Sequence, residues 1–247
     1  MEAILNFDLS VFKFIQDFIW ADWLTPIIKV ITWCGDGVFW IVLGVVLCVP
    51  KKTRKIGVAM LFAQLVMLLA NNVILKSIFS RTRPFALFNP EVAKLCDWMP
   101  EDYVQQVINE MKEFSAEFQQ KWLTTYQYIG TDIYPYAHGY SFPSGHTSSS
   151  FAAACGALSM CKGKGQKIFG WLSVVLATLI GFTRIYLHVH YTTDVLVGAV
   201  VGILCGVAGY FICKALMPYI QKLLDKIGGK SKKAPSDSSE LSAEPEA

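Results

Sequence analysis

The sequence predicts an all-α protein, a polytopic membrane bundle of about six transmembrane helices with a helical insert on the extracytoplasmic side. Three observations support this class. Hydrophobic residues make up 53% of the 247 residues, which is above the usual share of a soluble domain. They gather in uncharged blocks, the longest of which can cross a hydrocarbon core of about 30 Å. Short basic segments separate some of these blocks, as in cytoplasmic loops.

The N-terminal residues 1–20 mix apolar and polar side chains. Phe12, Ile15 and Ile19 share one face of a helix, so we expect an interfacial helix that lies along the membrane surface. No basic segment followed by a cleavage site occurs here, and a signal peptide is not expected.

Six apolar blocks follow, at residues 23–33, 38–49, 56–75, 151–161, 168–182 and 195–213. The first block is weak because Pro26 and Lys29 interrupt it. A five-span alternative therefore treats residues 23–49 as one broken span. Together the blocks define a membrane domain over residues 21–227.

In the last block, Gly198, Gly202 and Gly206 form a row of small residues at a spacing of four. Such a row favours close helix packing inside the bundle. Gln64, Asn71 and Asn72 of the third block are expected to hydrogen-bond between helices.

The distribution of lysine and arginine predicts the orientation. Residues 51–55 and 162–167 are basic loops, and lysines follow the last block. By the positive-inside rule these regions are cytoplasmic, which places residues 79–145 and 186–194 outside. We expect a multi-pass protein of the cell (inner) membrane with a cytoplasmic C-terminus. Its tail, residues 228–247, is rich in Ser, Pro, Lys and Glu and is expected to be disordered.

The outer insert, residues 85–141, carries more acidic than basic side chains. Within it, residues 100–126 are predicted to be helical because apolar residues recur at intervals of three and four. They are Val104, Val107, Met111, Phe114, Phe118 and Trp122. This helix either packs on the protein or the membrane surface, or covers a site as a lid. Packing is the preferred interpretation.

Charged and titratable side chains from three distant segments share the depth of the outer membrane interface. They are Lys76, Arg83, His146, Arg184, His190 and Asp194. Uncompensated charge at this depth would be costly, so together they predict a polar pocket. Lys76 and Arg83 are seven residues apart, two helical turns, and are expected to face one point. The guanidinium fork of arginine suits phosphate oxygens.

The fourth span begins with PSGH, residues 143–146. The first turn of a helix leaves N–H groups unpaired and attracts anions. Gly145 allows close approach of the backbone, and Ser144 can donate its hydroxyl. His146 would then stand beside a bound phosphate.

His190 and Asp194 are spaced i,i+4. If this segment is helical, Asp194 can accept a hydrogen bond from one ring nitrogen and leave the other as a base or nucleophile. His146 can then serve as the general acid for the leaving alcohol.

Three segments together resemble the motifs of the type 2 phosphatidic acid phosphatase superfamily. KSIFSRTRP (residues 76–84) resembles the first, K-x6-RP, and PSGH matches the second. TRIYLHVHYTTD (residues 183–194) resembles the third, SR-x5-H-x3-D, with Thr183 in place of serine. Thr183 keeps the hydroxyl group.

The resemblance implies a metal-independent phosphatase that needs no cofactor and acts through a phosphohistidine. His190 would be the nucleophile, Asp194 its orienting partner and His146 the acid. Five residues would hold the phosphoryl oxygens: Lys76, Arg83, Ser144, Gly145 and Arg184.

The expected partners are the bilayer and a lipid phosphate or diphosphate, with no nucleic acid. Polyprenyl diphosphate is slightly preferred, by analogy with small bacterial members, over phosphatidic acid and phosphatidylglycerophosphate. A lipid-linked phosphotransferase or a non-enzymatic anion-binding membrane protein are the alternatives. His138 and His188 are interpreted as loop or packing residues, and Arg81 as a contact for a lipid headgroup.

Overall fold

The computed structural model describes residues 2–84, 116 and 139–229. All regular secondary structure in these ranges is helical, which confirms the predicted all-α class. The helix predicted at residues 100–126 and most of the C-terminal tail lie outside the described residues. The chain divides into two compact units, Met1–Cys213 and Lys214–Ala247, and the predicted site lies in the first.

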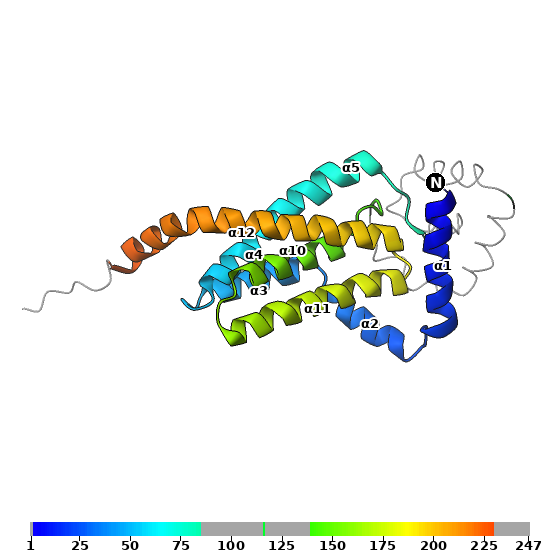
Figure 1. The fold of residues 1–247 in the computed structure, drawn as a ribbon, viewed down its shortest axis with the longest axis horizontal. Coiled ribbons are helices and arrows are strands. Elements are labelled where there is room, and N and C mark those ends of the chain that lie inside the picture. Colours follow the sequence, from blue (N-terminus) through cyan, green and yellow to red (C-terminus); the bar gives the residue numbers. More distant parts are fainter. Residues whose placement is uncertain (1, 85–115, 117–138, 230–247) are drawn as a thin grey trace, which may run out of the picture. The chain divides into compact units, whose positions relative to one another are not determined.

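Figure 1 shows the order of the helices within the described residues. They are α1 (Glu2–Phe18), α2 (Leu24–Trp33), α3 (Gly37–Cys48), α4 (Arg54–Met67), the π-helix η1 (Leu68–Leu75), α5 (Lys76–Phe79), α10 (Gly145–Met160), α11 (Lys164–Tyr186) and α12 (Thr192–Gly229). Asp36 starts α3 as its N-cap, because its carboxylate accepts a hydrogen bond from Val38 N–H at 3.0 Å.

Among the described residues, three helical stretches are long and apolar enough to cross a membrane: Arg54–Phe79, Lys164–Tyr186 and Thr192–Lys226. Helices α2 and α3 pass the same test together, but they meet at a bend of 55°. The number of candidate spans is therefore three, or four with the bent pair. The bend agrees with the alternative in which residues 23–49 form one broken span. With 16 residues, α10 is shorter than the other candidates, and the six-span count stays a prediction.

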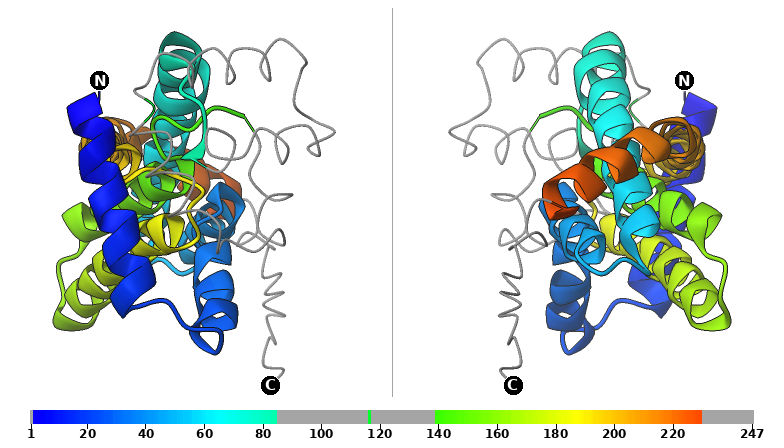
Figure 2. Two further views of the ribbon diagram at one scale, coloured as in Figure 1. Left: turned by 90° about the vertical axis from the view of Figure 1, so that its right-hand side faces the viewer. Right: turned by 90° about the vertical axis from the view of Figure 1, so that its left-hand side faces the viewer.

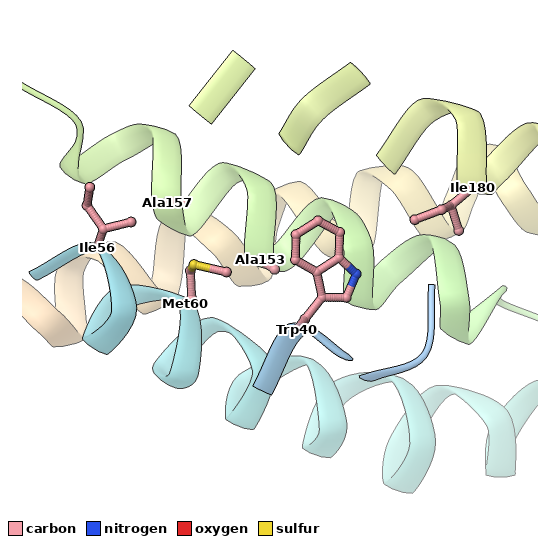
Figure 3. Packing of buried hydrophobic residues seen from close by; sticks show 6 residues of the cluster. All are labelled: Trp40, Ile56, Met60, Ala153, Ala157 and Ile180. Carbon is pink, nitrogen blue, oxygen red and sulfur yellow. The ribbon is translucent and has the colours of Figure 1, made fainter. Parts of the chain in front are cut away.

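The core of the first unit lies where α3, α4, α10 and α11 meet (Figure 3). Trp40 of α3 is fully buried and packs with aliphatic side chains, and its indole Nε1 donates to Ser150 Oγ at 3.1 Å. The face of α10 in this core is built from alanines such as Ala153 and Ala157. These small side chains let neighbouring helices approach α10 closely.

The glycine row of α12 packs against α10. A Cβ atom on Gly198 would lie 2.9 Å from the carbonyl oxygen of Ser144, and one on Gly202 would lie 2.5 Å from that of Ser148. Real Cβ atoms are essentially never found this close to backbone. The predicted close packing through this row is confirmed, and it fixes the first turn of α10 against α12.

Polar side chains tie α4 and η1 to α10. Gln64 Nε2 donates to Ser149 O at 2.7 Å, and Ser149 Oγ donates back to Gln64 Oε1 at 2.8 Å. Asn71 in η1 accepts a hydrogen bond from Ser148 Oγ at 3.2 Å. The predicted interhelical hydrogen bonds of Gln64 and Asn71 are confirmed.

Helix α1 lies across the ends of α11 and α12 (Figures 1 and 2). Its inner face is buried, with Phe12 0% and Ile15 2% exposed. Its outer face is also apolar and is exposed: Ile4, Phe7, Phe14 and Phe18. The face on which the interfacial helix was predicted, with Phe12 and Ile15, therefore packs on the protein instead of facing lipid. The interfacial position of α1 stays a prediction, for which the exposed apolar face is the suitable surface.

Candidate active site

The structure brings the predicted site residues together from distant parts of the chain. Lys76 begins α5, Arg83 lies four residues after its end, and His146 lies in the first turn of α10. Arg184 lies in the last turn of α11, His190 in the following loop and Asp194 in the first turn of α12.

Arg83 reaches the site from outside a helix, which corrects the prediction that helical spacing aligns it with Lys76. Helix α5 ends at Phe79, and Ser80 adopts a left-handed conformation with φ 39°. Arg83 is nevertheless only 4% exposed. Its charge acts on Lys76 and on Arg184, so the cations do converge.

The Arg83 guanidinium is held between two chain segments and a histidine. Its Nε donates to Gly139 O at 2.8 Å, and NH1 donates to Val189 O at 2.9 Å. The same NH1 lies 3.2 Å from His190 Nε2. Because a guanidinium can only donate, His190 Nε2 must accept, and the ring proton is on Nδ1.

His190 Nδ1 faces the carboxylate of Asp194. It lies 3.5 Å from Asp194 Oδ2, and the backbone of Ser141 also interacts with this ring. Since α12 begins at Thr192, His190 precedes the helix and helical spacing is not the cause of this contact. Instead Asp194 Oδ2 reaches back to accept from Tyr191 N–H at 3.0 Å. The Ser141 hydroxyl donates to the same oxygen.

The pKa of His190 lies well below its usual range. Burial is the main cause, because it disfavours the charged ring, and the charges of Arg83, Arg184 and Lys76 act in the same direction. His190 is therefore neutral at physiological pH, with a lone pair on Nε2. A neutral imidazole with an accepting nitrogen beside a cationic pocket is suited to attack a phosphorus atom.

The first turn of α10 forms the other wall. Ser144 is the N-cap, and its side chain makes no capping hydrogen bond. Its backbone N–H donates to Asp194 O at 3.1 Å, and its hydroxyl accepts from Thr147 Oγ1 at 2.9 Å. Amides in a first turn without a side-chain cap are available to an anion.

Arg184 is positioned by a residue of α2. Its NH1 donates to Thr32 Oγ1 at 2.8 Å, and within the described residues its buried Nε has no partner. The Thr183 hydroxyl lies 3.0 Å from the same Thr32 oxygen. The threonine that replaces the serine of the motif thus keeps a polar contact next to Arg184.

A cavity of about 510 Å³ lies at the edge of the candidate site. Lys76, Gly145 and His146 line one part of it. Other parts are lined by exposed apolar side chains: Val38, Ile41, Leu65 and Leu68. The cavity therefore borders both Lys76 and His146 of the candidate site and a set of exposed apolar side chains.

Sequence reasoning missed several contributors: Asp8, Thr32, Gly35 and Ser141. A detectable signal existed for Asp8, which is an acidic residue on the face of α1 that also carries Phe12. The structure gives Arg81 two carboxylates as partners, those of Asp8 and Asp194, in place of the predicted headgroup contact. His188 packs on Phe12 with ring centroids 4.8 Å apart, and burial lowers its pKa to about 3. His138 lies outside the described residues.

The described residues thus combine helices long enough to cross a membrane with clustered cationic side chains and two histidines, which are the features of a membrane protein with a candidate site for an anion. Residues 52–218 match the model of the PAP2 superfamily, and the chain belongs to this superfamily. The sequence-based prediction of the family is confirmed.

Several curated relatives are phosphatases. The undecaprenyl-diphosphatase BcrC of Bacillus subtilis is 33% identical over 108 residues, 42% of this chain and 53% of the relative. Phosphatidylglycerophosphatase B of the same species is 34% identical over 109 residues, 40% and 50% of the two chains. An undecaprenyl-diphosphatase of Sulfolobus acidocaldarius is 23% identical over 201 residues, 81% and 76%. This chain spans about half the length of the two Bacillus relatives.

A solved structure shares the fold. The transmembrane PAP2-type phosphatidylglycerolphosphate phosphatase of Bacillus subtilis superposes with a TM-score of 0.54 at 23% identity, over 89% of each chain. This likeness supports a membrane helical fold for the chain.

Proposed function

We propose that this chain is an integral membrane phosphatase that hydrolyses a lipid phosphate or diphosphate through a phosphohistidine on His190. One observation carries the proposal. The accepting nitrogen of a buried, neutral His190 lies 3.2 Å from the Arg83 guanidinium, while Asp194 faces the opposite nitrogen. A phosphoryl group bound by Arg83 would thus lie next to the nucleophile.

In the first step, Lys76, Arg83 and Arg184 bind the phosphoryl oxygens. His190 Nε2 attacks phosphorus, and the bond from phosphorus to the leaving oxygen breaks. The electron pair passes to that oxygen, which takes a proton from His146; the negative charge of the bound phosphoryl group favours the protonated form of this histidine before the transfer. Asp194 stabilises the positive charge that develops on the His190 ring.

In the second step, a water molecule attacks the phosphohistidine. His146, now neutral, takes a proton from this water, and the bond between Nε2 and phosphorus breaks. Inorganic phosphate leaves, and His190 and His146 return to their starting protonation states. The same pair of histidines thus serves both halves of the reaction.

The cavity favours a lipid over a soluble ester, because exposed apolar side chains such as Ile41 and Leu65 line it beside Lys76 and His146. The names of the relatives make polyprenyl diphosphate and phosphatidylglycerophosphate the first candidates, with phosphatidic acid as a third.

The deciding experiment measures phosphate release by the detergent-purified protein in the presence of EDTA. The substrates are undecaprenyl diphosphate, phosphatidic acid, phosphatidylglycerophosphate and a soluble phosphate ester. We expect release from a lipid substrate, lost in His190→Ala with lipid binding retained. Wild-type release by the variant would refute the nucleophile. Release only when an acceptor alcohol is added would indicate a transferase.

We further propose that the site opens on the extracytoplasmic side and that the C-terminus is cytoplasmic, on the basis of the basic loops. A cysteine at exposed Ala116, in a background without native cysteines, should react with an impermeant label on intact cells. A cysteine at Lys164 should react only after permeabilisation. The reverse pattern would overturn the orientation.

A further inference from the structure

Asp8 of α1 forms a buried contact with the start of α12. Its side chain is 0% exposed, and both of its oxygens accept hydrogen bonds. Oδ1 accepts from Thr193 N–H at 2.9 Å, and Oδ2 accepts from Thr193 Oγ1 at 2.9 Å and from Arg81 NH2 at 3.1 Å. A buried carboxylate with three donors is a built contact, since an unpaired one would be costly.

Arg81 joins this carboxylate to that of Asp194. Its NH1 lies 2.6 Å from Asp194 Oδ1 and 2.8 Å from Thr193 Oγ1, and its guanidinium carbon lies 3.8 Å above the ring centre of Tyr191. Burial opposes its charge, but the carboxylates of Asp194 and Asp8 more than compensate and raise the pKa of Arg81. Arg81 therefore stays charged.

The two carboxylate oxygens of Asp194 have different hydrogen-bond partners. Oδ1 accepts from Arg81, whereas Oδ2 accepts from Tyr191 N–H and Ser141 and faces His190. Asp8 fixes the far side of the Arg81 guanidinium, so the chain of contacts runs from α1 to the imidazole.

We propose that Asp8 and Arg81 are positioning residues of the phosphatase, and that α1 is part of its active site. Docked through Asp8, α1 holds Arg81, which sets the position and charge of Asp194 behind His190. This inference rests on the proposed function of His190. It makes Arg81 a partner of Asp194 and not of the phosphate, because both terminal nitrogens of Arg81 are bound to carboxylates.

The test is the steady-state kinetics of Asp8→Asn on a lipid phosphate that the wild type hydrolyses. The variant loses the charge and sets an amide donor against Thr193 or Arg81. We expect kcat to fall about 10- to 100-fold, the cost of losing a partner that orients an active-site ligand. KM should stay within about 2-fold of wild type, because Asp8 makes none of the proposed phosphate contacts. Asp17→Asn, an exposed position on the same helix, should leave both constants unchanged.

A double-mutant cycle separates positioning from general damage to the fold. Arg81→Gln alone should lower kcat, and adding Asp8→Asn to it should have little further effect, because Asp8 acts through Arg81. Independent, multiplicative losses would overturn the inference, as would wild-type kcat in Asp8→Asn. If Asp8→Asn does not fold, Arg81→Lys should show the same fall in kcat at unchanged KM, and wild-type kinetics there would refute the proposal. A wild type that hydrolyses no substrate would instead be a failure of the proposed function.

Discussion

Gly35 lies at the bend between α2 and α3, against the ring of His146. A Cβ atom at this position would lie 2.5 Å from Ile180 Cγ2, 2.9 Å from His146 Cδ2 and 3.0 Å from Thr32 O. Non-bonded carbon atoms prefer a separation of at least about 3.5 Å. Gly35→Ala therefore requires the His146 ring to move by about 0.6 Å and Ile180 Cγ2 by about 1 Å, or the bend to open by about 1 Å.

A movement of this size should affect catalysis more than folding. Overpacking typically costs about 1–3 kcal/mol of stability, whereas a displacement of about 1 Å at a catalytic group can cost about 100-fold in rate. We expect kcat to fall about 10- to 100-fold while the folded protein is still recovered. The effect should appear with every lipid that the protein hydrolyses, because in the proposed mechanism His146 protonates the leaving oxygen of each.

The assay is phosphate release, with thermal unfolding in detergent measured on the same samples. Gly165→Ala is the matched control, because a Cβ atom added there would have no other atom within 4 Å, and it should match the wild type. Wild-type kcat in Gly35→Ala would show that Ile180 alone yields, or that His146 has no part in the rate-limiting step. Either result would refute the reasoning.

Three further changes test other parts of the structure. Gly202→Ala places a Cβ 2.5 Å from the backbone of α10 and should lower the free energy of unfolding by about 1–3 kcal/mol, measured by thermal unfolding. Gly163→Ala, where the added Cβ has open space, is the control. Equal unfolding midpoints for the two variants would contradict the close packing. Arg83→Lys loses the guanidinium fork and should lower kcat/KM roughly 10- to 100-fold, as expected from a charged hydrogen bond of about 1.5–3 kcal/mol, whereas Arg54→Lys at the start of α4 should not. In NMR of histidine-labelled protein, assigned through His190→Ala, the His190 ring should stay neutral when the pH falls through 6.5, because its pKa is lowered; an inflection between about pH 6 and 7 would contradict this.

The membership of the site could be predicted from the sequence, because charged residues in an apolar chain are rare and expensive. Arg83, Arg184 and His190 could be selected on that ground alone, and the structure places them together. The geometric reason given for Lys76 and Arg83 was wrong. The helix ends between them, and Ser80 there adopts a left-handed conformation that serine seldom takes. The sequence therefore has no glycine at this point to indicate the end of the helix.

The contacts of Asp8 could not be predicted from the sequence of α1 alone. Its position on the buried face of α1 follows from its spacing to Phe12, but its partners lie 73 and 185 residues away, at Arg81 and Thr193. Only the packing of α1 across the bundle brings them together. A single acidic residue near an N-terminus can have many different partners, and its spacing in the sequence does not predict which one it contacts.

The end of α5 explains how two neighbouring arginines acquire different roles. If the helix continued past Ser80, Arg81 and Arg83 would sit about 200° apart around its axis. The left-handed turn instead releases an irregular segment in which Arg81 reaches the carboxylates of Asp8 and Asp194, while Arg83 reaches His190. One guanidinium is neutralised by acids, and the other stays beside Lys76 and Arg184 in a pocket rich in positive charge. Such a concentration of positive charge favours an anion, and in the proposed mechanism a phosphoryl group bound there would meet the accepting nitrogen of His190.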